Sequence, residues 1–510
     1  MPGRSSGRSH FPRSPVNLTR RQLLAGAGVS AAALLLEPSG VQAQAPSSTT
    51  VVFSHTTVVT VDAVHNDVAL AVEGDKIVAI GPTDPILKTY PQAQVYDGRG
   101  KALLPGLINC HAHMAAVLQR GFNEDFGFPN SAKLAVQPSS LLQGEEATLM
   151  VTVAALEAIR TGTTTIVENA GGISRSAAAL AQTGLRCVFA ESIRDSENVG
   201  GPMSPEGLAK SEAPRFSPKL RDEGMQHIND LFTSWHGKNQ GRISVFPAAA
   251  LAETSSPELL QAVRAFAEKR DLGYTIHLSQ SRAEVDFMVR HHGLRPPAFL
   301  DKHGFLGPRL FAAHCRYVDD ADIALLGRSG TIISHQAAMA ANRGVIPPIP
   351  ALRAAGCPIA LGTDNNTNDV FEVMRVALLT ERIRRDDANP GVQPQPEDIL
   401  ADATQGGARA VQGKLLGSLE VGKKADLLVV DTLRAHLVPA GRIVSALIHS
   451  GHPSDIESVM VDGQFVMRQG KVLTMDEDSI IREADAVGRR IWSKVLEAGP
   501  LTVPRLPRAR

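Results

Sequence analysis

Eight candidate strands alternate with helical segments in the middle of the chain, and this alternation constrains the fold more than any other feature. The candidate strands end near residues 109, 168, 189, 246, 277, 314, 334 and 363. Amphipathic helical periodicity lies between them, for example over residues 139–160 and 256–270. Eight such units in roughly 260 residues are typical of a (β/α)₈ barrel. The sequence therefore predicts an α/β protein with a TIM-like barrel over residues 105–407.

Shorter β segments flank the barrel region on both sides. Before it, apolar segments such as residues 76–80 are separated by turn residues, and residues 417–473 repeat this texture after it. Two β-rich pieces at opposite ends of the chain predict one small β-sandwich domain built from both. We assign its first part to residues 49–104 and its second part to residues 408–475, followed by a C-terminal helix and tail over residues 476–510.

The first 43 residues have the three-part order of an export signal. Arg20 and Arg21 precede an apolar run from Leu23 to Leu36, and Val41-Gln42-Ala43 resembles a cleavage site. The run is about 14 residues long, shorter than the roughly 20 that span a bilayer. Paired arginines before a Gly/Ala-rich run resemble a twin-arginine signal. We expect a signal peptide over residues 1–43, a periplasmic or secreted protein and no membrane span; a disordered basic tail is the alternative.

Five residues at candidate strand ends form a set that suits a divalent cation. His111 and His113 lie two residues apart, so both imidazoles point to one side of their strand. His277, His314 and Asp364 each end a later strand. Each of these residues alone would fit a structural role, but the strand ends of a barrel converge on one face. Imidazole and carboxylate ligands with one position open to water are typical of a catalytic zinc site.

Several motifs stand around these residues in a fixed order. They are Pro105-Gly106-Leu107 before His111 and His113, Thr161-Gly162-Thr163-Thr164-Thr165, His277, His314, Ser334-His335, Gly362-Thr363-Asp364 and the segment 417–426. With them the chain resembles the amidohydrolase superfamily from about residue 51 to about residue 475. The closer resemblance is to its branch of triazine chlorohydrolases, cytosine deaminases and S-adenosylhomocysteine-type deaminases.

The resemblance implies a metal-dependent hydrolase in which one divalent cation activates water. Carried over residue by residue, the ligands of this cation are His111, His113, His277 and Asp364. Zn²⁺ is the expected metal, and Fe²⁺ or Mn²⁺ would fit the same ligands. Binuclear relatives place a carboxylated bridging lysine at the end of the fourth strand, but residues 245–248 contain no lysine. A single metal ion follows.

The resemblance also implies the catalytic groups. Asp364 would accept a proton from the water and return it to the leaving group. His314 and His335 would orient the water and stabilise the tetrahedral intermediate. Relatives are often dimers or larger, so we expect a homo-oligomer that acts on a small molecule.

Two departures from the relatives limit the substrate. Relatives that deaminate heterocycles usually carry Glu three residues after the third metal-binding histidine, and here that position is Gln280. An amide can hydrogen-bond to a substrate but cannot serve as an acid near neutral pH. Glu284 lies a full helical turn further on, and Ala248 replaces the histidine of a Pro-His pair at the fourth strand. Both departures argue against ordinary purine or cytosine deamination.

The leading hypothesis is a hydrolase of carbon–nitrogen bonds other than peptide bonds. Its substrate would be an amide, carbamate, urea or amino-heterocycle, with Gln280 as a substrate-binding residue. The alternatives are a deaminase or dechlorinase of an N-heteroaromatic ring that uses another acid, and a non-catalytic periplasmic protein that binds a metal or ligand. The latter needs no proton shuttle, so Asp364, His314 and His335 argue against it. The formal net charge of zero gives no indication of nucleic acid, and residues 195–224 form either a mobile cover or a plain surface insertion.

Overall fold

The computed structural model describes residues 50–60, 62–122, 124–126, 134–200, 203–365, 367–385, 392–499 and 501. The predicted signal peptide and the end of the predicted tail lie outside these residues. None of the helices in the described part is both long and apolar enough to cross a membrane.

Eight parallel strands form the predicted barrel. In chain order they are β6 (Leu107–Ala112), β7 (Thr163–Ala170), β8 (Arg186–Ile193), β9 (Ile243–Leu251), β10 (Tyr274–Leu278), β11 (Leu310–His314), β12 (Ile332–His335) and β13 (Ile359–Leu361). Each strand pairs in parallel with the next. The last strand returns to the first, because the N–H groups of Thr363 and Asp364 both donate to the carbonyl of His111. The barrel prediction is confirmed.

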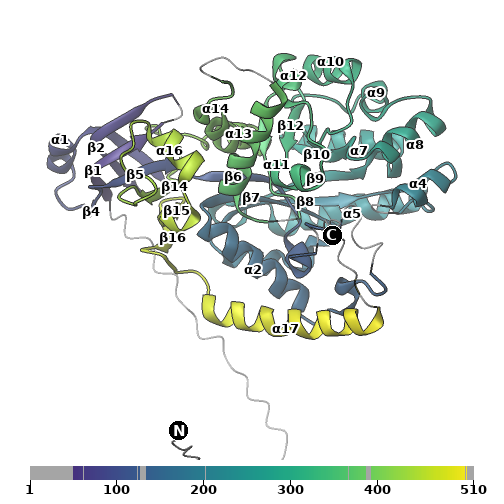
Figure 1. Cartoon of the computed structure of the whole chain (residues 1–510), viewed down its shortest axis with the longest axis horizontal. Helices are drawn as coiled ribbons and strands as arrows, with labels where there is room; N and C mark the ends of the chain where they lie inside the picture. The colour runs from purple at the N-terminus through teal and green to yellow at the C-terminus, as the bar shows by residue number, and fades with distance from the viewer. Residues whose placement is uncertain are drawn as a thin grey trace, which may run out of the picture. The chain divides into compact units, whose positions relative to one another are not determined.

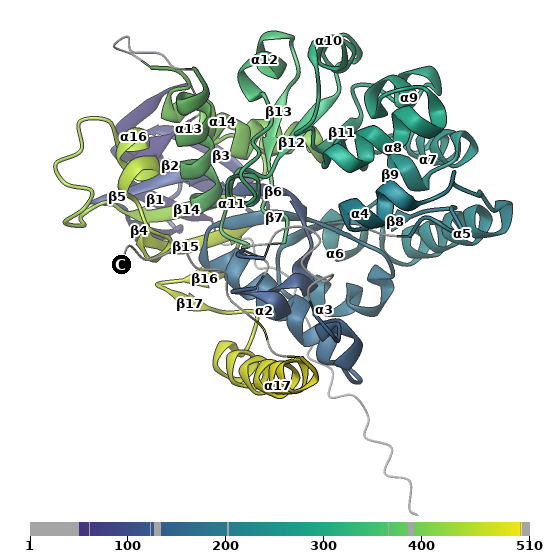
Figure 2. The ribbon, with the colours of Figure 1, turned by 45° about the vertical axis from the view of Figure 1, so that its right-hand side comes forward.

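Helices between the strands pack around the outside of the barrel (Figures 1 and 2). The principal ones are α2 (Glu146–Arg160), α5 (Pro218–Trp235), α7 (Pro257–Lys269), α8 (Arg282–His292), α10 (Asp320–Ser329), α12 (Ile349–Ala354) and α13 (Val370–Arg385). Helix α7 illustrates how the sequence determines where such a helix begins and which face it buries. Ser256 caps it by accepting the N–H of Leu259, Pro257 occupies its first turn, and its apolar face packs into the core.

The two ends of the chain join in one mixed sheet of nine strands, the domain predicted from both termini. Its strands are β1 (Val51–Val59), β2 (Val64–Glu73), β3 (Lys76–Pro82), β4 (Gln94–Asp97), β5 (Lys101–Pro105), β14 (Leu427–Asp431), β15 (Ile456–Val461), β16 (Gln464–Arg468) and β17 (Lys471–Val472). The pieces meet where β5 pairs antiparallel with β14, so strands from both ends lie side by side in Figure 1. This sheet buries its own apolar cluster, which includes Phe53, Leu103 and Leu427.

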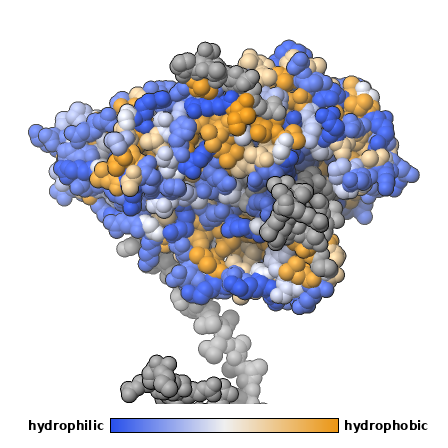
Figure 3. Space-filling model, in the orientation of Figure 1, coloured by the Kyte–Doolittle hydropathy of each residue, from blue (hydrophilic) through white to orange (hydrophobic). Residues whose placement is uncertain are grey.

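The predicted C-terminal helix is α17 (Glu477–Ala498), which packs on α2 (Figure 1). Ile491 and Val495 are buried, and the Trp492 indole N–H donates to the carbonyl of Leu118. Hydrophilic side chains run along the lower edge of Figure 3, where α17 lies. The helix is therefore amphipathic and turns its polar face outward.

The described part of residues 195–224 is a packed insertion. Its short helix α4 (Pro205–Lys210) contacts α8, and Arg290 on α8 donates to the carbonyl of Leu208. Val199 and Leu208 are buried. These contacts hold the insertion beside α8, which favours the interpretation as a surface insertion.

Candidate active site

Strands β6 and β13 position the first ligands through their backbones. His111 and His113 end β6, and the N–H of His113 donates to the carbonyl of Asp364 at 3.1 Å. Asp364 has φ 64°, in the left-handed region. A residue other than glycine adopts this conformation at a cost, and such strain clusters at functional sites. Here the conformation brings the Asp364 carboxylate towards the histidines, with Oδ1 3.6 Å from Nε2 of His113.

His277 and His314, at the ends of β10 and β11, complete the group. The Nε2 atoms of His113 and His277 lie 3.2 Å apart. On the far side of each ring, Nδ1 contacts a backbone carbonyl, that of Asn169 at 2.5 Å for His113 and that of Ala250 at 2.8 Å for His277. A carbonyl that accepts from Nδ1–H leaves the lone pair of Nε2 directed at the centre of the group.

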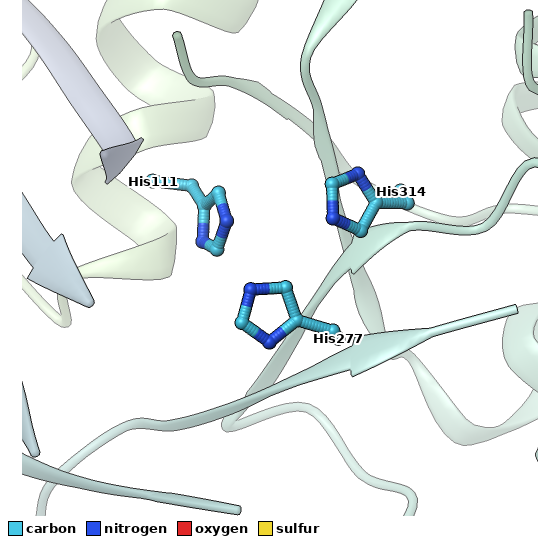
Figure 4. A group of neighbouring side chains, drawn as sticks. All are labelled: His111, His277 and His314. Carbon is cyan, nitrogen blue, oxygen red and sulfur yellow. The ribbon is translucent and has the colours of Figure 1, made fainter. Parts of the chain in front are cut away.

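The rings converge on one point (Figure 4). Ligand atoms of His111, His277 and His314 lie within 4.8 Å of one another, and so do those of His111, His113 and Asp364. Both ring nitrogens of His111 and Nδ1 of His314 are buried without a hydrogen-bond partner among the described residues. Buried polar atoms without partners are costly, and a divalent cation would satisfy them. The donor set therefore fits the predicted metal.

Burial also sets the protonation that a metal site needs. It lowers the pKa of His277 to about 4 and holds the pKa of His111 and His314 well below the usual value. These imidazoles are neutral at pH 7 and can bind a cation. Burial raises the pKa of Asp364, while the nearby positive charges of Arg343 and Arg316 oppose that rise.

A cavity of about 420 Å³ opens above the cluster. Beside the histidines and Asp364, its polar wall includes Asn169, Ser192, Arg194, Gln280, Arg316 and Arg343. Within the described part of the chain, Asp364 is the only carboxylate in this lining. The three arginines were not among the residues predicted from the sequence. The one available signal was spacing, because Arg316 follows His314 by two residues, as His113 follows His111.

Gln280 lines the cavity as expected for a substrate-binding residue, and its backbone is held on both sides. Glu284, which is fully buried, accepts the N–H groups of Ser279 and Gln280 at 2.7 Å each. Arg316 donates to the carbonyl of Gln280. Glu284 is not part of the cavity wall. It positions the turn that carries Gln280 and does not replace the missing acid.

The structure does not bring His335 to the described site, so the geometry gives its predicted catalytic role no support. Its side chain is buried but absent from the described cavity lining and from the ligand clusters. Burial, with the charge of Arg353 on α12, lowers its pKa to about 3. Ser334 contacts Cys110 on the buried strand β6, and side chains alternate along a strand, so His335 faces the opposite side of β12. The neighbours Ser334 and Gln336 occupy the opposite side, where Gln336 accepts the N–H of His314.

Residues 102–466 match the amidohydrolase family. The chain is 33% identical over 434 residues to 5-methylthioadenosine/S-adenosylhomocysteine deaminase of Desulforudis audaxviator, covering 84% of this chain and 95% of the relative. It is 31% identical over 404 residues to 5'-deoxyadenosine deaminase of Methanothermobacter thermautotrophicus, covering 78% and 89%.

Solved structures agree with the fold. A zinc-bound adenosine deaminase from Xanthomonas campestris is 27% identical with a TM-score of 0.77, covering 87% of this chain and 98% of that one. The zinc complex of atrazine chlorohydrolase from Arthrobacter aurescens is 23% identical with a TM-score of 0.76, covering 86% and 100%, and shows the fold alone. The barrel and its histidine–aspartate cluster are those of a metal-dependent hydrolase. This chain belongs to the amidohydrolase family, and it hydrolyses carbon–nitrogen bonds other than peptide bonds with a divalent metal ion, for which zinc is expected.

Proposed function

We propose that this enzyme hydrolyses the C–N bond of an amide, carbamate or urea, and that it does not deaminate aminopurines. The observation that carries the proposal is the cavity wall, where Asp364 is the only carboxylate among the described lining residues. Removing an amino group from a purine ring needs an acid that protonates a ring nitrogen as water adds. Gln280 cannot supply that proton, and Glu284 lies outside the cavity.

Carbonyl substrates need only the groups that are present. His111, His113, His277 and Asp364 would hold the cation, which would supply an activated water and polarise the carbonyl. Asp364 takes the proton of the attacking water and returns it to the nitrogen as the C–N bond breaks, so acid and amine leave as products. The neutral imidazole of His314 stabilises the developing oxyanion.

Gln280 contributes orientation in this scheme. Gln280 lines the cavity from a turn that Glu284 and Arg316 hold on both sides. It can donate to a substrate oxygen or accept from a substrate N–H without changing charge. A fixed hydrogen-bonding group of this kind sets the carbonyl against the attacking water.

The test compares two substrate classes in the zinc-loaded enzyme. Amides, carbamates and ureas are assayed for released ammonia or amine, and adenosine and 5'-methylthioadenosine for the change in ring absorbance. Asp364→Asn gives the background in both assays. We expect turnover in the first class and none above background in the second. Aminopurine deamination at rates typical of enzymes, as the names of the relatives would suggest, would overturn the proposal.

We also propose that the chain is exported and acts outside the cytoplasm as a homo-oligomer. The order of paired arginines, apolar run and Val41-Gln42-Ala43 supports export. The expected oligomer rests on the family resemblance, and light scattering of the purified enzyme measures it.

A further inference from the structure

Arg316 occupies an unusual position for a buried cation. The residue is only 9% exposed, yet its guanidinium lines the active-site cavity. It donates to the carbonyl of Gln280, and its Nε has no hydrogen-bond partner among the described residues. Among the described residues no ion pair joins Arg316 to a carboxylate, although the charges of Asp364 and Glu284 act on it from further away. Burial consequently lowers the pKa of Arg316.

Two other arginines with little exposure differ from Arg316, because each forms ion pairs with two carboxylates. Arg186 contacts Asp426 at 3.1 Å and Asp462 at 2.7 Å. Arg353 likewise contacts two carboxylates, Glu381 on α13 and Asp402 at the start of the helical segment Asp402–Gly406. These carboxylates raise the pKa of both arginines. A buried charge without such partners is costly. The charges of Asp364 and Glu284 offset the burial of Arg316 only in part, so its guanidinium can still bind an anionic partner.

The rest of the cavity adds to the positive charge. Arg194 and Arg343 also line it, and Arg343 donates to Asn365 at 3.4 Å. The single lining carboxylate, Asp364, is itself assigned to the cation. A low-dielectric cleft with charge of one sign concentrates ligands of the opposite sign.

We propose that the substrate carries an anionic group, a carboxylate or a phosphate, which Arg316 binds with its planar fork of N–H donors and Arg343 supports from the residue after α11 (Ala337–Asn342). The anionic group lies on the side of the cavity that carries Gln280, close to the C–N bond to be cleaved. The inference rests on the proposed function for the bond that breaks, but the anion site itself can be measured without turnover.

The experiment is calorimetric titration of zinc-loaded protein with probes that differ in charge. The probes contain no C–N bond, so none of them is a substrate: 3-benzoylpropionate carries a carboxylate, butyrophenone is its neutral analogue without that group, and phenyl phosphate represents the phosphate class. The variants are Arg316→Gln and Arg343→Gln, with Arg489→Gln as the matched control because Arg489 is exposed on α17. A charge-assisted hydrogen-bonded pair changes affinity by roughly tenfold to a hundredfold.

The wild type and Arg489→Gln should bind one of the anions at least tenfold more tightly than butyrophenone. Arg316→Gln should remove that preference without weakening the binding of butyrophenone, and Arg343→Gln should reduce it by a smaller factor. The anion that loses more affinity in Arg316→Gln identifies the natural group as a carboxylate or a phosphate. Arg316→Lys, which keeps the charge, should keep part of the preference.

The proposal is overturned if neither anion binds, or if both bind Arg316→Gln as tightly as the wild type, since an anion held only by the metal is indifferent to Arg316. If Arg316→Gln does not fold by thermal melting, Arg343→Gln and Arg316→Lys decide in the same way. Aminopurine turnover would defeat the proposed function and leave the anion preference intact. Loss of the anion preference alone would leave amide hydrolysis standing.

Discussion

Replacing Gln280 by Glu tests which chemistry the cavity lacks. Gln280 lines the cavity while Glu284 and Arg316 hold its backbone, so a side chain of nearly the same shape can be exchanged with little movement. The change adds one carboxyl group where related ring deaminases carry theirs. Gln280→Glu should therefore gain aminopurine deamination and lose part of the activity on carbonyl substrates.

The size of the gain follows from two opposing effects on the new carboxyl group. General-acid help is typically worth about 10²- to 10⁴-fold, and each tenfold is about 1.4 kcal/mol of barrier. Burial would raise the pKa of the new carboxyl group and favour the acid form, whereas the guanidinium of Arg316, which contacts the carbonyl of Gln280, would lower that pKa. The gain should lie near the lower limit, about 10²-fold. The same carboxylate would compete for Arg316 and weaken binding of an anionic substrate.

The assay measures kcat/KM for adenosine and for the best carbonyl substrate in the parent and in Gln280→Glu. Gln280→Asp is the matched control, because it adds the same charge but withdraws the carboxyl group by one methylene. Deamination should appear in Gln280→Glu, rise as pH falls below neutrality, and stay absent in Gln280→Asp.

Two results would refute this reasoning. One is a parent enzyme that already deaminates adenosine as fast as Gln280→Glu, which would show that another group supplies the proton. The other is unchanged activity on all substrates in Gln280→Glu. Gln280 would then serve only to support His277, three residues earlier in the chain.

Three further predictions concern the metal, the pH dependence and the N-terminus. Metal analysis should give one ion per chain, and His111→Ala or Asp364→Ala should lose metal and activity together; two ions in fully active enzyme would contradict this. Burial lowers the pKa of His277 from 6.5 to about 4. Between these values His277 is protonated in the unfolded chain but not in the folded protein, so the free energy of unfolding of metal-free protein should decrease as pH falls through this range. The loss is at most about 1.4 kcal/mol per pH unit. The free energy of unfolding, measured with urea, should depend less steeply on pH in His277→Asn than in the parent; an equal dependence would contradict this prediction. Mature protein should begin near Gln44, and replacing both Arg20 and Arg21 by Lys should block export. Mass spectrometry that finds an uncleaved chain in the cytoplasm would contradict this prediction.

The strand pattern was predictable because barrel strands are apolar and regularly spaced, but their ends were harder to place. β8 and β9 continue four and five residues beyond the predicted ends at 189 and 246. The added residues include Ser192 and Ala250, which line the cavity. Polar residues and a proline look like a strand end in the sequence. In the structure they are the part of each strand that faces the site.

The clustering of the predicted ligands and of His314 could be foreseen from the sequence, whereas the place of His335 could not. His111, His113, His277, His314 and Asp364 all follow apolar strands, and the strand ends of a barrel converge. His335 satisfies the same rule and yet is absent from the described cavity lining and from the ligand clusters. A strand places its side chains on alternate sides, so one residue of register decides between site and exterior.

The role of Arg316 could not be predicted from the sequence for a different reason. An arginine just after a strand is ordinarily a solvated surface group, and no spacing rule separates it from the exposed arginines of this chain. Only the folded structure shows that Arg316 is buried beside the cavity and that no carboxylate of the described residues forms an ion pair with it. Metal ligands can be recognised from the sequence because their chemistry requires particular residue types at strand ends. A residue that selects the substrate, such as Arg316, is recognised because it has no ion-pair partner in the folded protein. That absence becomes visible only when the positions of all its neighbours are known.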